Sequence, residues 1–599
     1  MRDFEETTRQ QSDSKIFKRL LEYAGPYKKN FIVSMIFILF DVALSSVSPM
    51  LIGLAVWIVR TNKPVNEKVV YLILVLIVFL ISIGVMITMV YFQNILLQSA
   101  GQKIVKDLRK EVFEHIERLS LGQFYKVPIG KMVTRVTNDT STLSEMYTSV
   151  IVNLIRNTLM MIVQFTIMLV INVKVTLIMG ITLPFVGILT FGYRRLARNQ
   201  YRRVRNENTN MNAFLQENLS GMKLTQIFNQ EERKHDEFDA QNRKLRKEQL
   251  KEITLFAFYR PLMYVISMLA GLIVIYYLGS DVVRMIQTGV AEELIIIRVA
   301  LLVTMYDYSM GFYRPLQSLS EDFNILQSAF ASAEKVFDVI DSTPEIEDAP
   351  DAVELVDFKG EIEFKNVWFY YLEGEWVLKD ISFKINPNDT IAFVGATGSG
   401  KTTIMNLIVR NYDVIKGEIL VDGINIKKIK LDSLRKHIGQ MPQDVFLFTG
   451  TIKSNIAFKD DDISTEDIIL ASKYVGVDSF IESLPDGYDY IVQERGSNFS
   501  TGQRQLLSFA RALVYEPTVM ILDEATANID SETEEIIQTS LEKMMAISTM
   551  IVVAHRLSTI QKADRIYVMQ KGEIVEFGSH QELLKKAGIY YSLYELQDK

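Results

Sequence analysis

Six long apolar tracts, all within the first 330 or so residues, constrain the fold of this chain more than any other feature. A helix needs about 20 apolar residues to cross the hydrocarbon core of a bilayer, and each tract is about that long or longer. The rest of the chain has the mixed composition of a soluble domain. The sequence therefore predicts a multi-domain membrane protein with an N-terminal all-α transmembrane domain of six helices. The tracts lie at about 30–59, 69–98, 149–172, 175–193, 255–279 and 294–313.

Basic residues at the ends of the tracts predict how the chain is oriented in the membrane. Lys28 and Lys29 precede the first tract, and six arginines between 194 and 205 follow the fourth. Because segments rich in Lys and Arg stay in the cytoplasm, this pattern places both termini there. Basic residues on the first outer loop, such as Arg60, run against the rule but do not reverse the whole set.

Helical periodicity continues from the spans into two cytoplasmic polar stretches, as at the apolar positions Ile104, Leu108 and Val112. We therefore expect the spans to extend as long helices beyond the membrane. These hairpins are expected to turn near 122–130 and 210–221, where short helices could dock on a soluble domain.

The chain divides into four segments. Residues 1–29 form a cytoplasmic N-terminus in which Ser14–Gly25 has an apolar and a basic helical face. This helix is expected at the membrane surface, and an ordinary solvated helix is the alternative. Residues 30–330 form the transmembrane domain, 331–357 a linker, and 358–599 an α/β domain with a largely parallel sheet.

Composition excludes several other classes of protein. The chain has no cysteine, so a disulfide framework, a thiolate zinc site and a cysteine nucleophile are ruled out. Its formal net charge is −7, so it lacks the net positive charge that is typical of proteins that bind nucleic acids. We therefore expect no nucleic-acid partner.

The motif that most clearly carries chemistry is the glycine-rich stretch IAFVGATGSGKTT at Ile391–Thr403. Its glycines let successive backbone amides face phosphate oxygens, and the following helix adds its N-terminal amides and positive dipole end. Lys401 is placed to reach the β and γ phosphates, and Thr402 to bind Mg²⁺. This predicts a P-loop NTPase domain. The expected nucleotide contacts are Gly395, Thr397, Gly398, Ser399, Gly400, Lys401, Thr402 and Thr403.

Polar side chains follow apolar, strand-like segments of the same domain. Four apolar residues, Val519–Leu522, lead to Asp523 and Glu524. In such a pair the first carboxylate holds Mg²⁺ through water, and the second polarises the attacking water. His555 ends another apolar strand, where its imidazole can contact the γ-phosphate. Gln443 comes after a further strand, where its side chain could sense whether a γ-phosphate is bound.

Charged residues inside the expected spans are functional candidates because burial of charge in a membrane is costly. Asp307 lies among aromatic residues, including Tyr306, and shares a helical face with Met310. An acid among aromatic and Met side chains suits an adaptable cavity for amphipathic cations. The alternative, an ion pair with an Arg of a neighbouring helix, stays open for Asp307 and is favoured for Asp41. The charged residues in the spans are Asp41, Arg156, Arg298 and Asp307.

The order of these motifs resembles the nucleotide-binding domain of ABC transporters over residues 358–599. The matching stretches are VWFYY with Tyr371, GATGSGKT, Gln443, FSTGQ at 499–503, ILDE and His555. The membrane half resembles the six-span exporters of that family through Phe124, Gly130, Arg135 and Asp139 in the first hairpin. The whole chain is thus similar to a bacterial ABC exporter half-transporter.

The resemblance implies ATP and Mg²⁺ as cofactors, a cytoplasmic (inner) membrane location and a second half-transporter as partner. Tyr371 is then the adenine contact, and Glu494 faces the docking helices of the membrane half. Catalysis is assigned by resemblance to Glu524, His555 and Gln443, and the metal to Thr402, Gln443 and Asp523.

The family signature LSGGQ appears here as FSTGQ, with Thr501 where a glycine is expected. By resemblance, Ser500, Thr501, Gly502 and Gln503 cap the nucleotide of the partner domain. A β-branched residue adds a Cβ and restricts φ where close backbone approach is needed, so we expect poor hydrolysis at the capped site. Since this chain's own catalytic residues are intact, the pattern favours a heterodimer whose partner has a consensus signature. A homodimer that tolerates Thr501 is the alternative.

The function predicted by the resemblance is ATP-driven efflux of amphipathic small molecules as one half of an exporter in the lipid bilayer. A lipid flippase or a peptide exporter would use the same ATP-driven mechanism. A nucleotide-gated channel or a regulatory subunit would not need the intact Glu524 and His555. An importer with this membrane fold is a further alternative.

Overall fold

The structure, a computed structural model, describes residues 12–458, 460, 462–523, 531–553 and 560–597. The chain separates into two compact units. The helical unit comprises Met1–Glu117 and Ile129–Ser342, and the α/β unit comprises Arg118–Pro128 and Thr343–Lys599.

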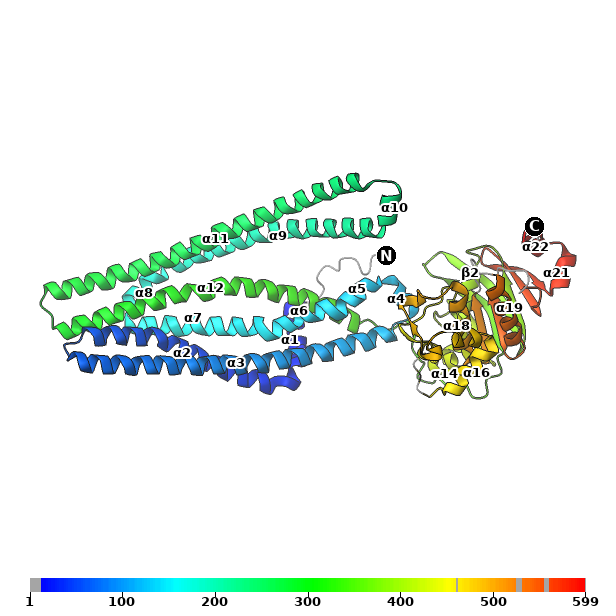
Figure 1. Cartoon of the computed structure of the whole chain (residues 1–599), viewed down its shortest axis with the longest axis horizontal. Helices are drawn as coiled ribbons and strands as arrows, with labels where there is room; N and C mark the ends of the chain where they lie inside the picture. Colours follow the sequence, from blue (N-terminus) through cyan, green and yellow to red (C-terminus); the bar gives the residue numbers. More distant parts are fainter. Residues whose placement is uncertain (1–11, 459, 461, 524–530, 554–559, 598–599) are drawn as a thin grey trace. The chain divides into compact units, whose positions relative to one another are not determined.

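Long helices joined by short turns make up the helical unit (Figure 1). Within the described residues, six helical stretches are long and apolar enough to cross a membrane, which confirms the predicted six-helix domain. Two wider, π-helical turns lie at Arg135–Asp139 and Met146–Val150. The α-helices are α1 (Asp13–Ala24), α2 (Lys28–Arg60), α3 (Val65–Arg118), α5 (Ile129–Thr134), α6 (Thr140–Glu145), α7 (Ile151–Ile171), α8 (Val173–Gly180), α9 (Thr182–Ser220), α10 (Met222–Ile227), α11 (Glu231–Gln287) and α12 (Glu292–Ile340).

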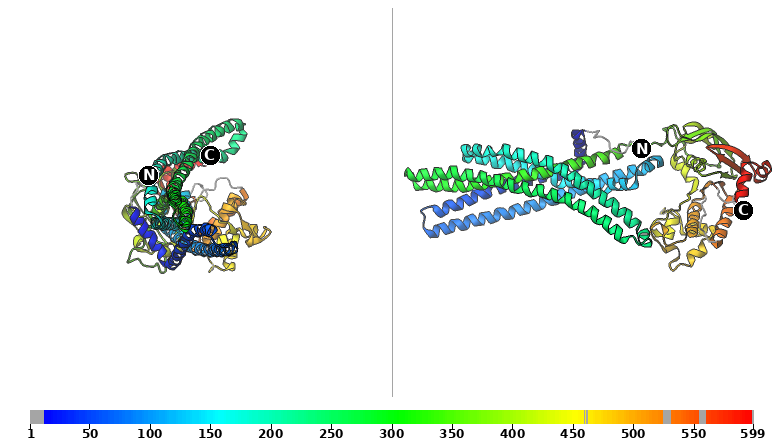
Figure 2. Two further views of the ribbon diagram at one scale, coloured as in Figure 1. Left: turned by 90° about the vertical axis from the view of Figure 1, so that its left-hand side faces the viewer. Right: turned by 90° about the horizontal axis from the view of Figure 1, so that it is seen from above.

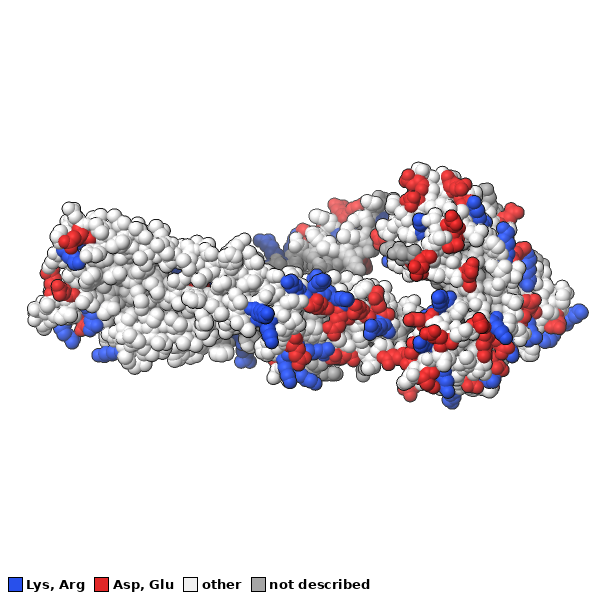
Figure 3. All heavy atoms as spheres, turned by 90° about the horizontal axis from the view of Figure 1, so that it is seen from below, with Lys and Arg blue, Asp and Glu red and all other residues white. Residues whose placement is uncertain are grey.

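Several helices are much longer than a membrane is thick. Helix α3 has 54 residues and α11 has 57. At 1.5 Å per residue each is about 80 Å long, whereas the hydrocarbon core measures about 30 Å. Figure 3 shows a wide, nearly uncharged band on the helical unit with charged side chains beyond both of its ends. The predicted extension of the spans into long polar helices is therefore present.

The two hairpins turn at short helices. The first turns at α4 (Leu121–Lys126), which overlaps the predicted range of 122–130, and α4 belongs to the α/β unit. The second, formed by α9 and α11 with α10 at its tip, is visible in both views of Figure 2. Its turn lies at residues 221–230, later than the predicted 210–221, because α9 continues to Ser220 and ends at Gly221.

Helix α1 packs against the helical unit through part of its apolar face. Ile16 and Leu20 are buried, whereas Phe17 and Leu21 are exposed. Arg19 forms an ion pair of 2.6 Å with Asp341, just beyond α12. Because α12 ends only at Ile340, the first ten residues of the predicted linker are helical.

The α/β unit contains a six-stranded sheet with the order β12-β11-β3-β10-β9-β6, in which only β12 is antiparallel to its neighbour. A four-stranded antiparallel sheet has the order β2-β1-β4-β5, and β7 pairs with β8. The strands are β1 (Ile362–Tyr370), β2 (Trp376–Ile385), β3 (Thr390–Val394), β4 (Lys416–Val421), β5 (Ile424–Asn425), β6 (Ile438–Met441), β7 (Gly450–Thr451), β8 (Ile491–Val492), β9 (Val519–Asp523), β10 (Thr549–Val553), β11 (Arg565–Gln570) and β12 (Glu573–Gly578). The α-helices, besides α4, are α13 (Lys401–Ile408), α14 (Leu431–Lys436), α15 (Ile452–Ile456), α16 (Thr465–Val475), α17 (Asp478–Glu482), α18 (Thr501–Leu513), α19 (Ser531–Met545), α21 (His580–Lys586) and α22 (Ile589–Gln597).

Alternating side chains of the central strands supply two hydrophobic cores, one on each face of the parallel sheet. In β3, Ala392 and Val394 join the core that includes α16 and α18. Ile391 and Phe393 join the opposite core, which includes α13 and the antiparallel sheet. Since successive side chains of a strand point to opposite faces, burial on both sides explains the unbroken apolar strands in the sequence. The structure thus has the predicted largely parallel α/β domain.

Candidate functional site

The carboxyl ends of four neighbouring parallel strands, β3, β10, β9 and β6, lie at one edge of the sheet. Strand β3 leads into the glycine-rich loop, and β9 ends at Asp523. Gln443 lies two residues beyond β6. Glu524 comes directly after β9 in the chain and His555 comes two residues after β10, but both lie outside the described residues. Open parallel sheets bind ligands at this edge, so the glycine-rich loop, Asp523 and Gln443 lie where a nucleotide can meet them.

The loop after β3 approaches other backbone so closely that glycine is required. Gly395 has a φ of 147°, and a Cβ there would lie 2.2 Å from the carbonyl oxygen of Met569. Gly398 and Gly400 also have positive φ, at 80° and 106°. Helix α13 begins directly after Gly400, so its free N-terminal amides and positive dipole end face the loop. Thr397 is exposed in the same loop.

Lys401 is buried and its ammonium group is held by the loop. Its Nζ donates to the carbonyl oxygens of Gly395, at 2.8 Å, and Ala396, at 3.1 Å. Burial lowers the pKa of Lys401, while the charge of Asp523 opposes the shift. Anionic phosphate oxygens are stronger acceptors than carbonyls, so they can replace these contacts. The buried Ser399 hydroxyl has no hydrogen-bond partner among the described residues, which leaves it free for a further acceptor.

Two oxygen ligands of the kind that Mg²⁺ prefers lie together at the start of α13. The Thr402 hydroxyl donates to Asp523 Oδ2 at 3.4 Å, across two segments far apart in the chain. Mg²⁺ favours hard oxygen donors and keeps several waters and phosphate ligands. The donor set formed by Thr402 and Asp523 therefore fits Mg²⁺.

Tyr371 lies beside the same helix, and its aromatic ring is partly exposed to solvent. Its hydroxyl donates to Thr403 Oγ1 at 3.1 Å. Its ring meets Tyr412 edge-on, with ring centres 5.1 Å apart, and 45% of the side chain is exposed. A flat ring fixed on one side and open on the other can stack on a nucleotide base. The sequence offered no signal for Tyr412, because its role depends on contacts with residues distant in the chain.

Helix α4 packs beside Tyr412 within the α/β unit. A Cβ at Gly122 would lie 2.7 Å from Tyr412 Cε1. Gln123 Nε2 donates to the Thr343 carbonyl at 2.8 Å, and its Oε1 accepts from the Glu345 amide at 3.0 Å. Burial, first of all, raises the pKa of Tyr412, so the phenol stays neutral in this contact. The predicted docking of a short hairpin helix on the soluble domain is therefore present for the first hairpin.

The signature residues cap helix α18. The Ser500 hydroxyl accepts from the Gln503 amide at 3.2 Å, and Gln503 Oε1 accepts from the Ser500 amide at 2.9 Å. Gly502 is buried. Gln443 and Thr501 line one cavity of about 310 Å³, so the structure brings Gln443 together with the signature of its own chain.

The backbone restriction expected at Thr501 is absent from the structure. Thr501 is the first residue of an ordinary α-helix and does not have positive φ, so its β-branch meets no backbone restriction. The added side chain remains, and its hydroxyl accepts from Arg504 Nη2 at 3.3 Å. Any weakening of the capped site must therefore come from the side chain rather than from the backbone.

The charged residues of the spans have different surroundings. Asp41 is 1% exposed, and its Oδ2 accepts from Arg156 Nε at 2.6 Å, which confirms the ion pair favoured for Asp41. Arg298 pairs with Asp281 at 2.6 Å. Asp307 is half-buried and forms no ion pair with any residue that the structure describes. The ion-pair alternative for Asp307 therefore finds no support in the described part of the chain.

Tyr306 and Met310 pack against α11 on either side of Asp307 in the sequence. A Cβ at Gly271 of α11 would lie 2.8 Å from Tyr306 Cε2 and 3.4 Å from Met310 Sδ. These two side chains therefore fill the space that Gly271 leaves open. Their part in a substrate cavity stays a prediction.

Comparison with known proteins decides the family. The model of the ABC transporter transmembrane region matches residues 31–303, and that of the ABC transporter matches residues 378–527. A putative ABC transporter ATP-binding protein, exp8, of Streptococcus pneumoniae is 37% identical over 97% of this chain and 97% of its own length. The chain belongs to the ABC exporter family.

Other relatives carry the printed names of different exporters. An ATP-dependent lipid A-core flippase of Syntrophus aciditrophicus is 34% identical over 98% of this chain and 95% of its own length. YheH of Bacillus subtilis, named as a probable multidrug resistance ABC transporter, is 37% identical over 86% of this chain and 76% of its own length. A solved structure of a bacterial Atm1-family ABC exporter with ATP bound has a TM-score of 0.76, 25% identity, and coverage of 96% of this chain and 98% of that one.

Family membership establishes what this ABC exporter does in outline. It is a multi-pass membrane protein that binds ATP and hydrolyses it to drive transport. One transmembrane region and one ATP-binding region in a single chain make it a half-transporter, which acts as a dimer.

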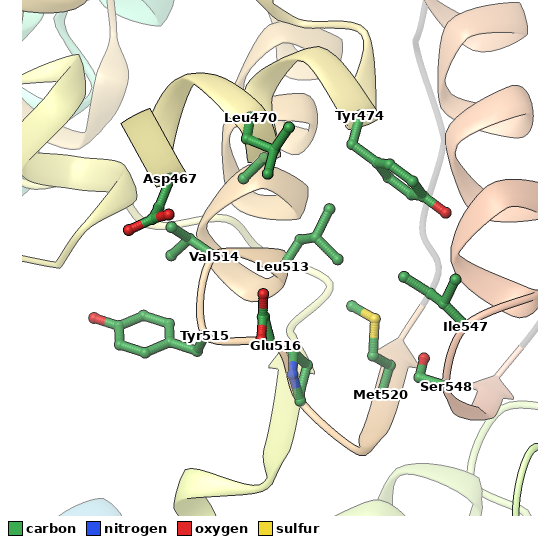
Figure 4. A pocket seen from close by; sticks show the side chains of 12 residues that line it. Asp467, Leu470, Tyr474, Leu513, Val514, Tyr515, Glu516, Met520, Ile547 and Ser548 are labelled. Carbon is green, nitrogen blue, oxygen red and sulfur yellow. The ribbon is translucent and has the colours of Figure 1, made fainter. Parts of the chain in front are cut away.

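A second cavity of the exporter lies away from the nucleotide edge. It measures about 560 Å³ and opens at the amino-terminal edge of the parallel sheet, beside Met520 of β9 and Ser548 before β10 (Figure 4). Leu513, at the end of α18, and Tyr474, on α16, line its other sides. None of the predicted nucleotide residues is among its described lining residues.

Proposed function

We propose that this ABC exporter expels amphipathic small molecules, in the manner of a multidrug exporter. The observation that carries the proposal is Asp307, a half-buried acid on α12 without an ion pair among the described residues. Tyr306 and Met310 beside it supply an aromatic face and a flexible, polarizable side chain. This combination suits cations of varied shape that carry apolar groups.

The experiment compares transport of two kinds of substrate by the complete exporter in inside-out vesicles. A fluorescent amphipathic cation should accumulate in the vesicles when ATP is added. Asp307→Asn keeps the size of the side chain but removes its charge, so cation uptake should fall about fivefold or more while uptake of a neutral amphipathic dye changes little. Equal loss for both dyes, or no loss for the cation, would remove Asp307 from substrate recognition.

A lipid flippase is the second candidate, favoured by the relative named as a lipid A-core flippase. The same vesicles distinguish the two functions. ATP-dependent movement of a fluorescent lipid between leaflets, without uptake of the cation, would replace the multidrug proposal.

The chemistry proposed at the sheet edge assigns one task to each group. Lys401, Ser399 and the amides of the glycine-rich loop hold the phosphates, and Tyr371 stacks on adenine. Mg²⁺, when bound, neutralises phosphate charge, and its proposed protein ligands are Thr402, Gln443 and Asp523. Glu524 polarises the attacking water and His555 contacts the γ-phosphate, as the resemblance implies for these two positions.

The proposed partner is a different half-transporter. The signature of this chain, with Thr501, would cap a poorly hydrolysing site on the partner. The partner's consensus signature would then complete the competent site built on Lys401 and Asp523. The altered signature beside intact catalytic residues is what supports this asymmetric pairing.

We further propose that the exporter lies in the cytoplasmic (inner) membrane with both termini in the cytoplasm. The basic flanks of the spans support this orientation. Single cysteines introduced into the cysteine-free chain can report it with a membrane-impermeant thiol reagent applied to intact cells. We expect labelling at position 62 and none at position 223; the reverse pattern would overturn the orientation.

A further inference from the structure

A groove between α9 and α11 lies at one end of the membrane-spanning part of α11. Its volume is about 640 Å³. Gln200 lines it from α9, and a stretch of α11 lines the rest. The residues contributed by α11 are Arg243, Arg246, Lys247, Leu250, Lys251, Thr254 and Leu255.

The groove changes from apolar to basic along α11. Leu255 begins the apolar tract of this helix, and Leu250, which is half exposed, lies about one turn before it. At 1.5 Å per residue, Lys251 is about 6 Å and Lys247 about 12 Å from Leu255 along the axis. Since long basic side chains can extend toward a membrane surface, both ammonium groups can reach the headgroup layer.

Among the described residues, two of the basic side chains that line the groove form ion pairs and two do not. Lys251 Nζ pairs with Glu248 at 2.5 Å, and Arg243 pairs with Asp239 at 3.2 Å. Hydrogen bonds, first from Lys251 and then from Gln200, lower the pKa of Glu248, so this carboxylate stays charged. Arg246 and Lys247 form no ion pair with any described residue. The groove therefore keeps two uncompensated positive charges next to an apolar end.

We propose that this groove binds the phosphate headgroup of an anionic phospholipid, with the acyl chains along Leu250 and Leu255. The lipid belongs to the cytoplasmic leaflet, in the orientation proposed above. Charge complementarity supports a phosphate at Arg246 and Lys247, and the adjoining apolar tract supports a tail. More arginines, at 194, 195, 198, 202 and 203 of α9, raise the positive potential near this end of the membrane.

The test must separate a lipid site from the general effect of basic residues on membrane orientation. Lys247→Gln and Lys244→Gln remove the same charge from the same helix. Lys247 lines the groove, whereas Lys244 is exposed and is not one of its lining residues. Both variants affect the overall charge of the exporter equally, so any difference between them belongs to the groove.

The measurement is lipid binding to the full-length exporter in detergent, counted by native mass spectrometry. Dioleoyl phosphatidylglycerol is the anionic probe, and dioleoyl phosphatidylcholine with the same chains is the neutral probe. We expect preferential binding of phosphatidylglycerol, an affinity about fivefold weaker in Lys247→Gln, and less than a twofold change in Lys244→Gln. Melting temperatures without added lipid show whether each variant is folded.

Three results would overturn the proposal. These are equal losses in the two variants, equal binding of the two lipids, and displacement of the lipid by millimolar inorganic phosphate, which would indicate a site for free anions. None of the measurements depends on transport, so failure here would leave the proposed exporter function untouched.

Discussion

Side chains around Lys401 are held in place by contacts within the α/β unit. Loop carbonyls hold the ammonium group in a buried position, and Asp523 supports its charge. Thr402 contacts Asp523 through its hydroxyl. Contacts that hold the donors in one arrangement reduce the ordering that phosphate binding requires, and this favours binding.

The clearest test of catalysis is Glu524→Gln. The amide keeps the shape of the side chain but cannot accept a proton from water, so ATP turnover should fall about 100-fold or more. ATP binding should remain, since the residues that hold the phosphates are unchanged. Steady-state phosphate release and equilibrium binding of a fluorescent ATP analogue measure the two effects. Glu516→Gln, an exposed glutamate elsewhere in the α/β unit, is the matched control. Turnover near the normal rate in Glu524→Gln would exclude Glu524 as the base.

Local motifs explain why much of this site could be predicted from the sequence. The glycine at 395 is required by backbone approach within a short loop, and the apolar strand before Asp523 is a local pattern. Tyr412 could not be predicted, because its contacts with Tyr371 and Gly122 join segments that are distant in the chain. The restriction expected at Thr501 was wrong since the sequence does not reveal that this residue begins a helix.

Among the elements, α4 connects the hairpin of α3 and α5 to the surface beside Tyr412. Its capping box fixes the start of the helix, and Gln123 ties it to the backbone of residues 343–345. Gly122 provides the space for the Tyr412 ring. Contacts of this kind can pass a change at the nucleotide to the helices that continue from α4.

Gly122→Leu should disturb this docking. A side chain at Gly122 would overlap the Tyr412 ring, and overpacking of this kind costs about 1–3 kcal/mol. We expect stimulation of ATPase activity by transported substrate to fall several-fold, while basal ATPase activity changes little. Gly130→Leu is the control in the same hairpin, because nothing lies within 4 Å of a Cβ at Gly130. Normal stimulation in Gly122→Leu, or the same loss in Gly130→Leu, would contradict a coupling role for the contact.

The existence of the helices was easier to predict than their contacts. Hydropathy alone identifies the six spans, since the membrane requires long apolar helices. The ion pair of Asp41 with Arg156 joins two spans 115 residues apart, so its partner could only be described as an unspecified arginine. The second hairpin turn was placed too early because residues 210–220 are compatible with helix, and only Gly221 stops it.

As a whole molecule, the exporter is one half of a dimer, and we propose that its altered signature caps a nucleotide site on the partner. The heterodimer hypothesis makes the activity of this chain depend on its partner. In an assembly of this chain alone, every nucleotide would be capped by a signature that contains Thr501.

The chain purified alone should therefore hydrolyse ATP slowly. In the proposed pairing, Thr501→Gly removes the side chain that faces the nucleotide of the other copy, so hydrolysis should rise about tenfold, which corresponds to a barrier lower by about 1.4 kcal/mol. Thr501→Ser is the control, because it retains the hydroxyl and Cβ and should gain little. Phosphate release per milligram of protein measures all three. Full ATPase and transport rates in the unmodified chain alone would favour the homodimer.

The inclusion of Arg118–Pro128 in the α/β unit also bears on how such exporters can be recombined. A graft that exchanges only the C-terminal segment between two relatives would place a foreign surface under the native α4, with Gly122 facing whatever side chain replaces Tyr412. Residues 118–128 would have to travel with the graft to preserve this contact. The residues that form the α/β unit are therefore discontinuous in the sequence, and chimeras cut at a single point should lose coupling even when both parts fold.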